Sequence, residues 1–327
     1  MVSRPAGTRR WRRRLRRAAY AALATLLTLT LASVVANALT VPPATLAPDG
    51  GSDVQVGGVR VHYRHWGPAG PPILLVHGFA ESSATWGPTV DLLARDHQVY
   101  AVDLAGYGYT DYTGDYSLED QVALVDGTIH ALHLDRPVVI GHSLGAAVVG
   151  ALALAHPGDI RGVIFADGDG LPFPGQDVRR VPPRWIYHLP YLTTAYRLGT
   201  RWDRLSSLLV RAQCGSVCRG LTPALVEAWM RPLRQGEAER ALPAIAATGI
   251  LHLTPEQIRR IDIPRGIIWG AEDATSGGSL TGAKANLGEP PTIVLAHAAH
   301  LAQIADPEGW AAAVRHIVAT WPATGPA

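Results

Sequence analysis

Residues 137–155, PVVIGHSLGAAVVGALALA, carry the strongest structural signal in the chain. The apolar run at 137–140 predicts a buried strand, and the longer run at 144–155 predicts a helix. Between them lies Gly141-His142-Ser143-Leu144-Gly145, where the chain must turn sharply and larger side chains at 141 or 145 would collide with neighbouring backbone. A buried strand leading directly into a helix is typical of a parallel sheet covered by helices.

The five residues of this turn fit G-x-S-x-G, a nucleophile elbow, which makes Ser143 the candidate nucleophile. A serine hydroxyl attacks a carbonyl carbon only when a base takes its proton. His300 is the preferred base because it follows the last predicted strand, and His297, three residues earlier, is the competitor.

A catalytic histidine needs a carboxylate that holds its tautomer and stabilises the imidazolium. Asp273 directly follows the predicted strand GIIWG and is the first choice. Asp167 or Asp169, after the predicted strand GVIFA, is the alternative. The sequence leaves this choice open.

The oxyanion of a tetrahedral intermediate needs two hydrogen-bond donors. The backbone N–H of Leu144, directly after the nucleophile, is one candidate. The N–H of Phe79, in the turn His77-Gly78-Phe79 after an earlier predicted strand, is the other. No metal or cofactor is required by this set of residues.

Strand and helix signals alternate along most of the chain. The predicted elements are a hairpin at 54–66, strands at 73–76, 98–104, 137–140, 162–166, 266–269 and 292–295, and helices at 85–95, 118–132, 144–155, 279–286 and 307–320. We therefore predict an α/β core formed by residues 54–169 and 259–327. Residues 170–258 lack a strand pattern and are expected to form a helical cap inserted after the sixth strand.

The amino terminus has the composition of a membrane signal. Residues 1–17 contain eight Arg and no acid, and residues 18–41 contain no charged side chain. About 20 apolar residues in a helix cross a hydrocarbon core, and a basic flank stays on the cytoplasmic side. We expect a transmembrane anchor with an extracytoplasmic catalytic domain, or a signal peptide cleaved near Ala38. Residues 42–53 are expected to be a linker.

The charge is divided unevenly along the 327 residues. Without the eight N-terminal Arg, 21 basic residues face 27 acidic ones, so the folded part is mildly acidic and is not expected to bind nucleic acid. The two cysteines, Cys214 and Cys218, lie in the predicted cap and are candidates for a disulfide in an exported protein.

Five blocks of the sequence resemble the alpha/beta-hydrolase superfamily, in its lidded serine-hydrolase branch of esterases, lipases, carbon–carbon bond hydrolases and haloperoxidases. They are HGFAESSATW at 77–86, DLAGYGYTD at 103–111, GHSLG at 141–145, WGAED at 269–273 and HLAQIADP at 300–307. The resemblance implies a mostly parallel eight-stranded sheet and an acyl-enzyme mechanism. Epoxide hydrolases of this branch have Asp in place of the nucleophile, so Ser143 argues against that activity.

The sequence therefore predicts a serine hydrolase that cleaves carboxylic esters, either acyl lipids or other apolar esters. The alternatives are a carbon–carbon bond hydrolase or a haloperoxidase/perhydrolase on the same triad and, in another class, a membrane-tethered binding protein without catalysis. Oligomeric state is not indicated by the sequence.

Overall fold

The computed structural model describes residues 7–168, 184–248, 252–274 and 279–322. Its centre is one eight-stranded sheet with the strand order β1-β2-β4-β3-β5-β6-β7-β8. The first two strand pairs are antiparallel and the remaining five are parallel. The strands are β1 Ser52–Val56, β2 Val59–Trp66, β3 Pro72–Val76, β4 Gln98–Val102, β5 Val138–His142, β6 Gly162–Ala166, β7 Arg265–Gly270 and β8 Thr292–Leu295.

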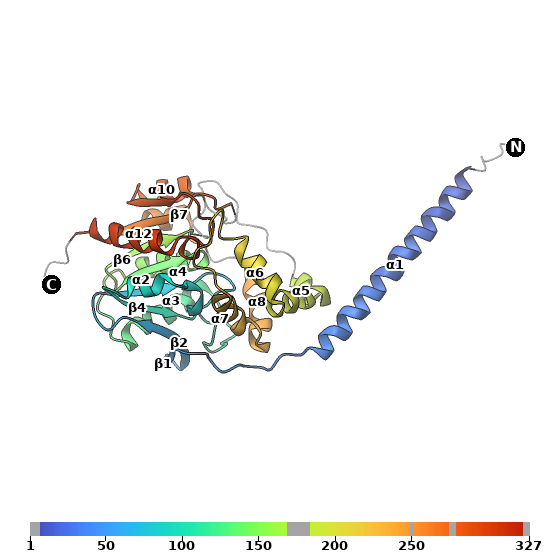
Figure 1. Ribbon diagram of the computed structural model, residues 1–327, viewed down its shortest axis with the longest axis horizontal. Helices are drawn as coiled ribbons and strands as arrows, with labels where there is room; N and C mark the ends of the chain where they lie inside the picture. The colour runs from blue at the N-terminus through green and yellow to red at the C-terminus, as the bar shows by residue number, and fades with distance from the viewer. Residues whose placement is uncertain (1–6, 169–183, 249–251, 275–278, 323–327) are drawn as a thin grey trace.

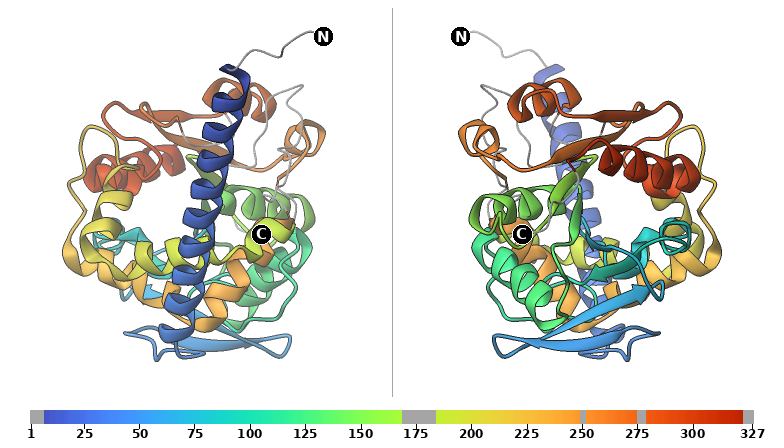
Figure 2. Two further views of the ribbon diagram at one scale, coloured as in Figure 1. Left: turned by 90° about the vertical axis from the view of Figure 1, so that its right-hand side faces the viewer. Right: turned by 90° about the vertical axis from the view of Figure 1, so that its left-hand side faces the viewer.

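Helices cover both faces of the sheet (Figure 2). Helices α3 and α4 pack against each other on one face, and α2 and α12 pack against each other on the opposite face. The helices outside the segment between β6 and β7 are α1 Gly7–Leu39, α2 Thr89–Leu93, α3 Leu118–Ala131, α4 Leu144–Ala155, α10 Leu280–Leu287, α11 Ala302–Ala305 and α12 Pro307–Ala319. The predicted fold class, a mostly parallel sheet between helices, is confirmed.

The core lies around β3, β5 and β6. All five residues of β5 and of β6 are buried, as are four of the five in β3. Because these strands face helices on both sides, their Val, Ile, Leu and Phe side chains form continuous apolar runs with no polar alternation.

The segment between β6 and β7 is helical in its described part, as expected for an insertion after the sixth strand. We call these helices the cap: η2 Arg184–His188, α5 Pro190–Arg201, α6 Asp203–Arg211, α7 Pro223–Leu233, α8 Gly236–Thr248 and α9 Pro255–Arg259. Figure 1 shows α5 to α8 gathered at the end of the body from which α1 emerges.

Helix α1 extends away from the body (Figure 1). It is long and apolar enough to cross a membrane, and only 6% of its most apolar window is buried. This exposure excludes the interpretation of α1 as a core helix. Its carboxyl-terminal half lies beside α5, where the two helices pack together.

Two local predictions were inaccurate. The continuous helix expected at 85–95 is replaced by the 3-10 helix η1, Ser83–Trp86, and the short α2, because Gly87 adopts φ 58° and Pro88 follows it. The expected linker at 42–53 ends earlier, since β1 begins at Ser52. Part of that linker is also hydrogen-bonded, because the carbonyl of Pro43 accepts a bond from the Gly236 N–H.

Candidate active site

Ser143 lies on the turn between β5 and α4, at the N-cap position of α4. Its backbone has φ 52° and ψ −119°, a strained conformation for a residue with a side chain. A Cβ added at Gly141 would lie 2.4 Å from the Gly145 carbonyl oxygen, and one added at Gly145 would lie 2.3 Å from the Val76 carbonyl oxygen. Both glycines are therefore required for the turn, as the sequence pattern indicated.

His300 is oriented between a hydroxyl and a carboxylate. Its Nε2 lies 2.9 Å from Ser143 Oγ, and its Nδ1 lies 3.0 Å from Asp273 Oδ2. The side chain of Asp273 is fully buried, and that of His300 is 10% exposed. With Nδ1–H donated to the carboxylate, Nε2 is free to accept the proton of the serine. The structure thus brings the three side chains together from the ends of β5, β7 and β8.

The competing candidates lie elsewhere. His297 is exposed, and its backbone carbonyl accepts the Val217 N–H. Asp167 is buried and its Oδ1 accepts the Gly270 N–H at 2.6 Å, so it joins the ends of β6 and β7. Burial raises the pKa of Asp167 well above its ordinary value, because it disfavours the charged carboxylate. Asp169 lies outside the described residues.

The turn after β3 approaches the nucleophile closely. A Cβ added at Gly78 would lie 2.8 Å from the Cβ of Ser143. The next residue is Phe79, which is 42% exposed. The turn after β3 and the first turn of α4, where Leu144 lies, are thus both close to Ser143, as two oxyanion donors at this site would need to be.

A buried ion pair lies behind the nucleophile, and it was not recognised from the sequence. His142 Nδ1 is 3.0 Å from Glu81 Oε1, and His142 Nε2 donates to the backbone carbonyl of His300 at 2.7 Å. Glu81 also accepts the Gly78 N–H at 3.0 Å. The pair therefore links the turn after β3, the nucleophile turn and the segment that carries His300.

Electrostatics keep both members of this pair charged. Burial favours neutral His142, but the neighbouring Glu81 carboxylate outweighs it and raises the His142 pKa to about 9. Burial would also raise the pKa of Glu81, yet His142 lowers it below its ordinary value. The sequence signal for this ion pair was Glu81, which follows His77-Gly78 closely in the chain. A carboxylate that is buried beside this turn needs a cationic partner.

The cap contacts the site through a small disulfide loop. Cys214 and Cys218 are joined by a disulfide, with their Cα atoms 5.4 Å apart. The N–H of Ala299 donates to the Cys214 carbonyl at 2.7 Å, and the N–H of Leu301 donates to the Gln213 carbonyl at 3.0 Å. These two residues flank His300 in the sequence, so the loop holds the histidine segment from both sides.

The same loop reaches the segment that carries Asp273. The Ser216 N–H donates to Glu272 Oε2 at 2.7 Å, and the Ser216 hydroxyl bonds the other oxygen of that carboxylate. A second cap contact runs from Trp229 Nε1 to the Ala80 carbonyl at 2.8 Å, beside the turn after β3. The cap is thus hydrogen-bonded next to three parts of the site.

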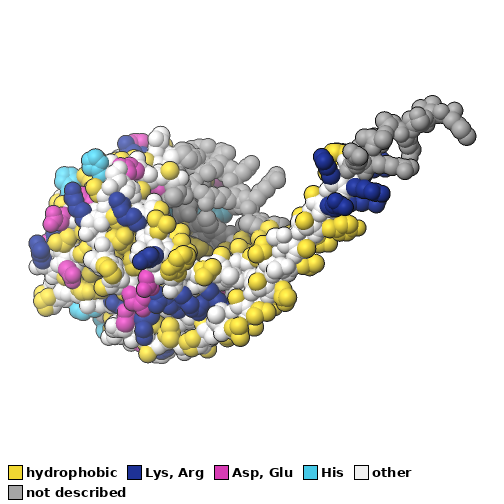
Figure 3. Space-filling model, turned by 45° about the vertical axis from the view of Figure 1, so that its right-hand side comes forward, with side chains coloured by type: hydrophobic (Ala, Val, Ile, Leu, Met, Phe, Trp, Pro, Cys, Tyr) yellow, Lys and Arg dark blue, Asp and Glu magenta, His cyan; other side chains and the backbone are white. Residues whose placement is uncertain are grey.

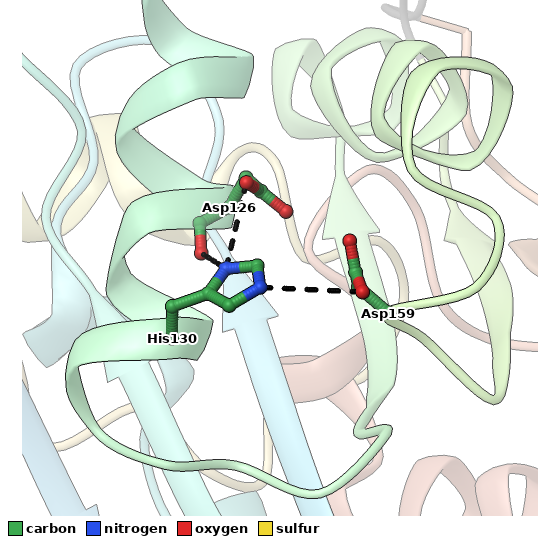
Figure 4. Close-up of side chains that lie close together, drawn as sticks. All are labelled: Asp126, His130 and Asp159. Atoms are coloured by element: carbon green, nitrogen blue, oxygen red, sulfur yellow. Dashed lines mark hydrogen bonds and ion pairs between the residues drawn. The ribbon is translucent and has the colours of Figure 1, made fainter.

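Among the described residues, Asp126, His130 and Asp159 form a separate cluster of potential metal ligands (Figure 4). His130 Nδ1 is 3.5 Å from Asp126 Oδ2, and its Nε2 is 4.0 Å from Asp159 Oδ1. The His130 pKa is raised by its hydrogen bond to the Asp126 carbonyl and by the Asp126 carboxylate. Asp126 and His130 lie on α3 and Asp159 follows the carboxyl end of α4, whereas Ser143 lies at the other end of α4; ion pairing accounts for the geometry of the cluster.

Comparisons with known proteins place this geometry in a family. The model of the alpha/beta hydrolase family matches residues 73–313. The uncharacterised hydrolase YugF of Bacillus subtilis (strain 168) is 26% identical over 226 residues, which cover 67% of this chain and 79% of that protein. A 2-hydroxymuconate semialdehyde hydrolase of Pseudomonas sp. (strain CF600) is 29% identical over 133 residues, 39% of this chain and 47% of that one.

Among solved structures, a bacterial membrane phospholipase A is similar in fold. It has a TM-score of 0.65 and 17% sequence identity, and the match covers 95% of this chain and 98% of the other. The family match spans most of the chain, including β3 to β8 and every residue placed in the site above. The protein therefore belongs to the alpha/beta hydrolase family.

Proposed function

We propose that this protein is a serine hydrolase that cleaves carboxylic esters through an acyl-enzyme. Ser143 Oγ attacks the ester carbonyl carbon while His300 Nε2 takes its proton, and Asp273 stabilises the imidazolium. The Phe79 and Leu144 N–H groups hold the oxyanion. His300 then protonates the departing alcohol, and a water molecule, activated by the same histidine, releases the acid and restores the serine.

One observation supports this proposal above the others. The His300 ring has one nitrogen 2.9 Å from the Ser143 hydroxyl and the other 3.0 Å from the Asp273 carboxylate. Simultaneous contacts of this kind orient the ring for proton transfer and need three chain segments to meet at one point. The strained backbone of Ser143 is also typical of a functional residue.

We propose further that α1 is retained as a membrane anchor, with the catalytic domain on the extracytoplasmic side. The Arg-rich end of α1 favours this orientation. Asn37, in the middle of the small-residue triplet 36–38, donates from its side chain to the Pro190 carbonyl at 2.9 Å and accepts a bond from Thr194. An anchored active site favours acyl lipids as substrates.

The first test is labelling of the full-length protein with a fluorophosphonate probe, together with hydrolysis of p-nitrophenyl esters. Ser143→Ala should abolish both, because no other group replaces the nucleophile. Ser207→Ala, a substitution in α6 away from the site, is the matched control and should keep both. Full activity of the Ser143 variant would refute the proposal.

A second activity is favoured by one relative, the 2-hydroxymuconate semialdehyde hydrolase. On the same three side chains, the protein would then cleave a carbon–carbon bond next to a ketone. Purified protein that hydrolyses a vinylogous diketone but leaves p-nitrophenyl esters intact would select this reaction over ester hydrolysis.

A further inference from the structure

The surface of α5 and α6 carries apolar side chains that nothing in the described structure covers. Leu192, Ala195 and Leu198 are exposed at three-residue spacing on one side of α5. Exposure of the larger side chains ranges from 42% to 64%: Leu192, Leu198, Trp202, Leu208, Leu209 and, in η2, Trp185. We call this set the apolar cap face.

The apolar cap face adjoins α1. Polar side chains join the two helices: Thr30 bonds Tyr191, and Ser33 Oγ lies 2.5 Å from Thr194 Oγ1. Hydrogen bonds of this kind between neighbouring helices are characteristic of packing within a membrane. Figure 3 shows the hydrophobic side chains of α1 continuing down to the body.

The depth of this contact follows from the length of the uncharged segment. Residues 18–41 contain no charge. At 1.5 Å per residue, about 20 of them cross a hydrocarbon core of about 30 Å, and counting from residue 18 this reaches residue 37 or so. Thr30 and Ser33, where α5 packs, then lie in the outer half of the bilayer. Helix α5 must lie at the same depth.

The charged groups around α5 agree with that placement. Arg197, 9% exposed, is paired with Glu239 at 2.7 Å and also donates to the Asn37 carbonyl and to Thr40 at the end of α1. Its charge is therefore satisfied internally. Trp202, Asp203 and Arg204 are exposed where α5 meets α6, and this placement puts them at the membrane–water interface, where aromatic and charged side chains are found.

We infer that the apolar cap face is inserted in the outer leaflet of the bilayer that α1 spans, and that the ester substrate is an acyl lipid taken from this leaflet. The cap connects the leaflet to the site, because Tyr196 of α5 bonds the Leu233 carbonyl at the end of α7, and Trp229 of α7 bonds Ala80. The inference rests on the proposed anchor and on the proposed ester hydrolysis. The tests below distinguish failure of membrane insertion from failure of either of these.

The test uses the full-length protein reconstituted in phosphatidylcholine/phosphatidylglycerol vesicles. Nitroxide labels on Leu198→Cys and Leu208→Cys report depth by their accessibility to oxygen and to a water-soluble nickel chelate. The two native cysteines are disulfide-bonded and do not react. Leu26→Cys in α1 is the lipid reference. Val294→Cys in β8, also exposed, is the aqueous control.

We expect the labels at 198 and 208 to be more accessible to oxygen than to the nickel chelate, as for the label at 26. The label at 294 should be more accessible to the nickel chelate. If the labels at 198 and 208 are accessible to the nickel chelate while the label at 26 is accessible to oxygen, the inference is wrong but the proposed anchor remains. Protection from both reagents also overturns it, since the face is then covered by protein and not by lipid. A water-accessible label at 26 refutes the anchor itself.

Kinetics give an independent readout. The double variant Leu198→Glu/Leu208→Glu should hydrolyse phospholipid in vesicles about tenfold more slowly or worse, because burial of one leucine changes a partition constant by about that factor. Its rate on a short, soluble p-nitrophenyl ester should match wild type, as should both rates of Val294→Glu. Equal loss on both substrates overturns the inference. Absence of soluble-ester hydrolysis in wild type refutes the proposed function instead.

Discussion

At the scale of single residues, neighbouring carboxyl groups in this protein differ in their partners. Asp273 contacts the His300 imidazole, whereas Asp167 accepts backbone N–H groups and has a raised pKa. Glu81 is equally buried but keeps its charge because His142 lies 3.0 Å away. The environment of each carboxyl thus assigns it a different state and, in our proposal, a different role.

The two aspartates give a direct test of the proposed triad. Asp273→Asn should lower kcat by roughly 10⁴-fold, as expected when a triad histidine is held in the wrong tautomer. Asp167→Asn should keep near-wild-type activity, because the amide oxygen still accepts the Gly270 N–H. Steady-state kinetics on a soluble ester measures both. The reverse pattern would make Asp167 the acid.

The Glu81–His142 pair predicts a pH dependence of stability. The His142 pKa rises from 6.5 to about 9 on folding. Its contribution to stability is therefore complete below about pH 6.5 and is lost as the pH rises through 9. Thermal melts should show the wild-type Tm falling over this interval, with a much smaller fall in Glu81→Gln.

The same substitution should cost about 3 kcal/mol near neutral pH, because it removes one partner of a buried ion pair. Glu289→Gln is the matched control, since Glu289 pairs with Lys284 at an exposed site and should contribute less than about 1 kcal/mol. Identical melts for wild type and Glu81→Gln between pH 6 and 9 would show that His142 is not charged in the folded protein.

At the scale of elements, the site is built where strand ends, the turn after β3 and one cap loop meet. The sheet supplies Ser143, Asp273 and His300 from three strand ends, but the segments that carry the last two are held from outside by the disulfide loop 213–218. We propose that this short loop, bonded on both sides of His300, restricts the movement of that histidine.

Opening the disulfide should therefore affect activity more than stability. For a loop this short, the crosslink contributes roughly 2 kcal/mol. We expect Cys214→Ser/Cys218→Ser to show a lower kcat at temperatures well below its Tm, because His300 loses its ordered support. Ser216→Ala, which removes only the hydroxyl bond to Glu272, should retain more activity. Equal kcat values for the double variant and wild type would contradict this role.

At the scale of the whole molecule, α1 and the cap form one unit at the end of the body opposite the carboxyl end of α12 (Figure 1). Arg197 holds this unit together, since it bridges Glu239 of α8 to the last turn of α1. The side chains of Arg197 and Glu239 are largely buried, so this ion pair adds to the hydrogen bonds that join α1 to α5.

Arg197→Ala should loosen α1 from the cap without unfolding the sheet. Spin labels on Leu29→Cys in α1 and Leu198→Cys in α5, both exposed, report the distance between the helices. We expect a narrow distance distribution in the wild-type background and a broad one with Arg197→Ala. Arg204→Ala, at an exposed position of α6, should leave the distribution narrow; broadening there as well would mean that the bridge has no special role.

Much of this architecture follows from the sequence, because its signals are local. The alternation of apolar strands and helices, the two glycines around Ser143 and the basic block before an uncharged helix all lie within short windows, where steric limits and periodicity act directly. The confirmed fold class rests on these windows. The helix predicted at 85–95 failed for a local reason too, since Gly87-Pro88 interrupts it.

Tertiary structure alone decided the rest. Residues 81 and 142, 214 and 299, and 33 and 194 are far apart in the chain, and no periodic pattern relates them. Their contacts depend on how the cap folds back on the sheet and on which strand ends become neighbours. The same limit applied to the proposed acid: two strand ends offered a carboxylate, and it is the fold that places Asp273 against His300 and Asp167 against the Gly270 N–H.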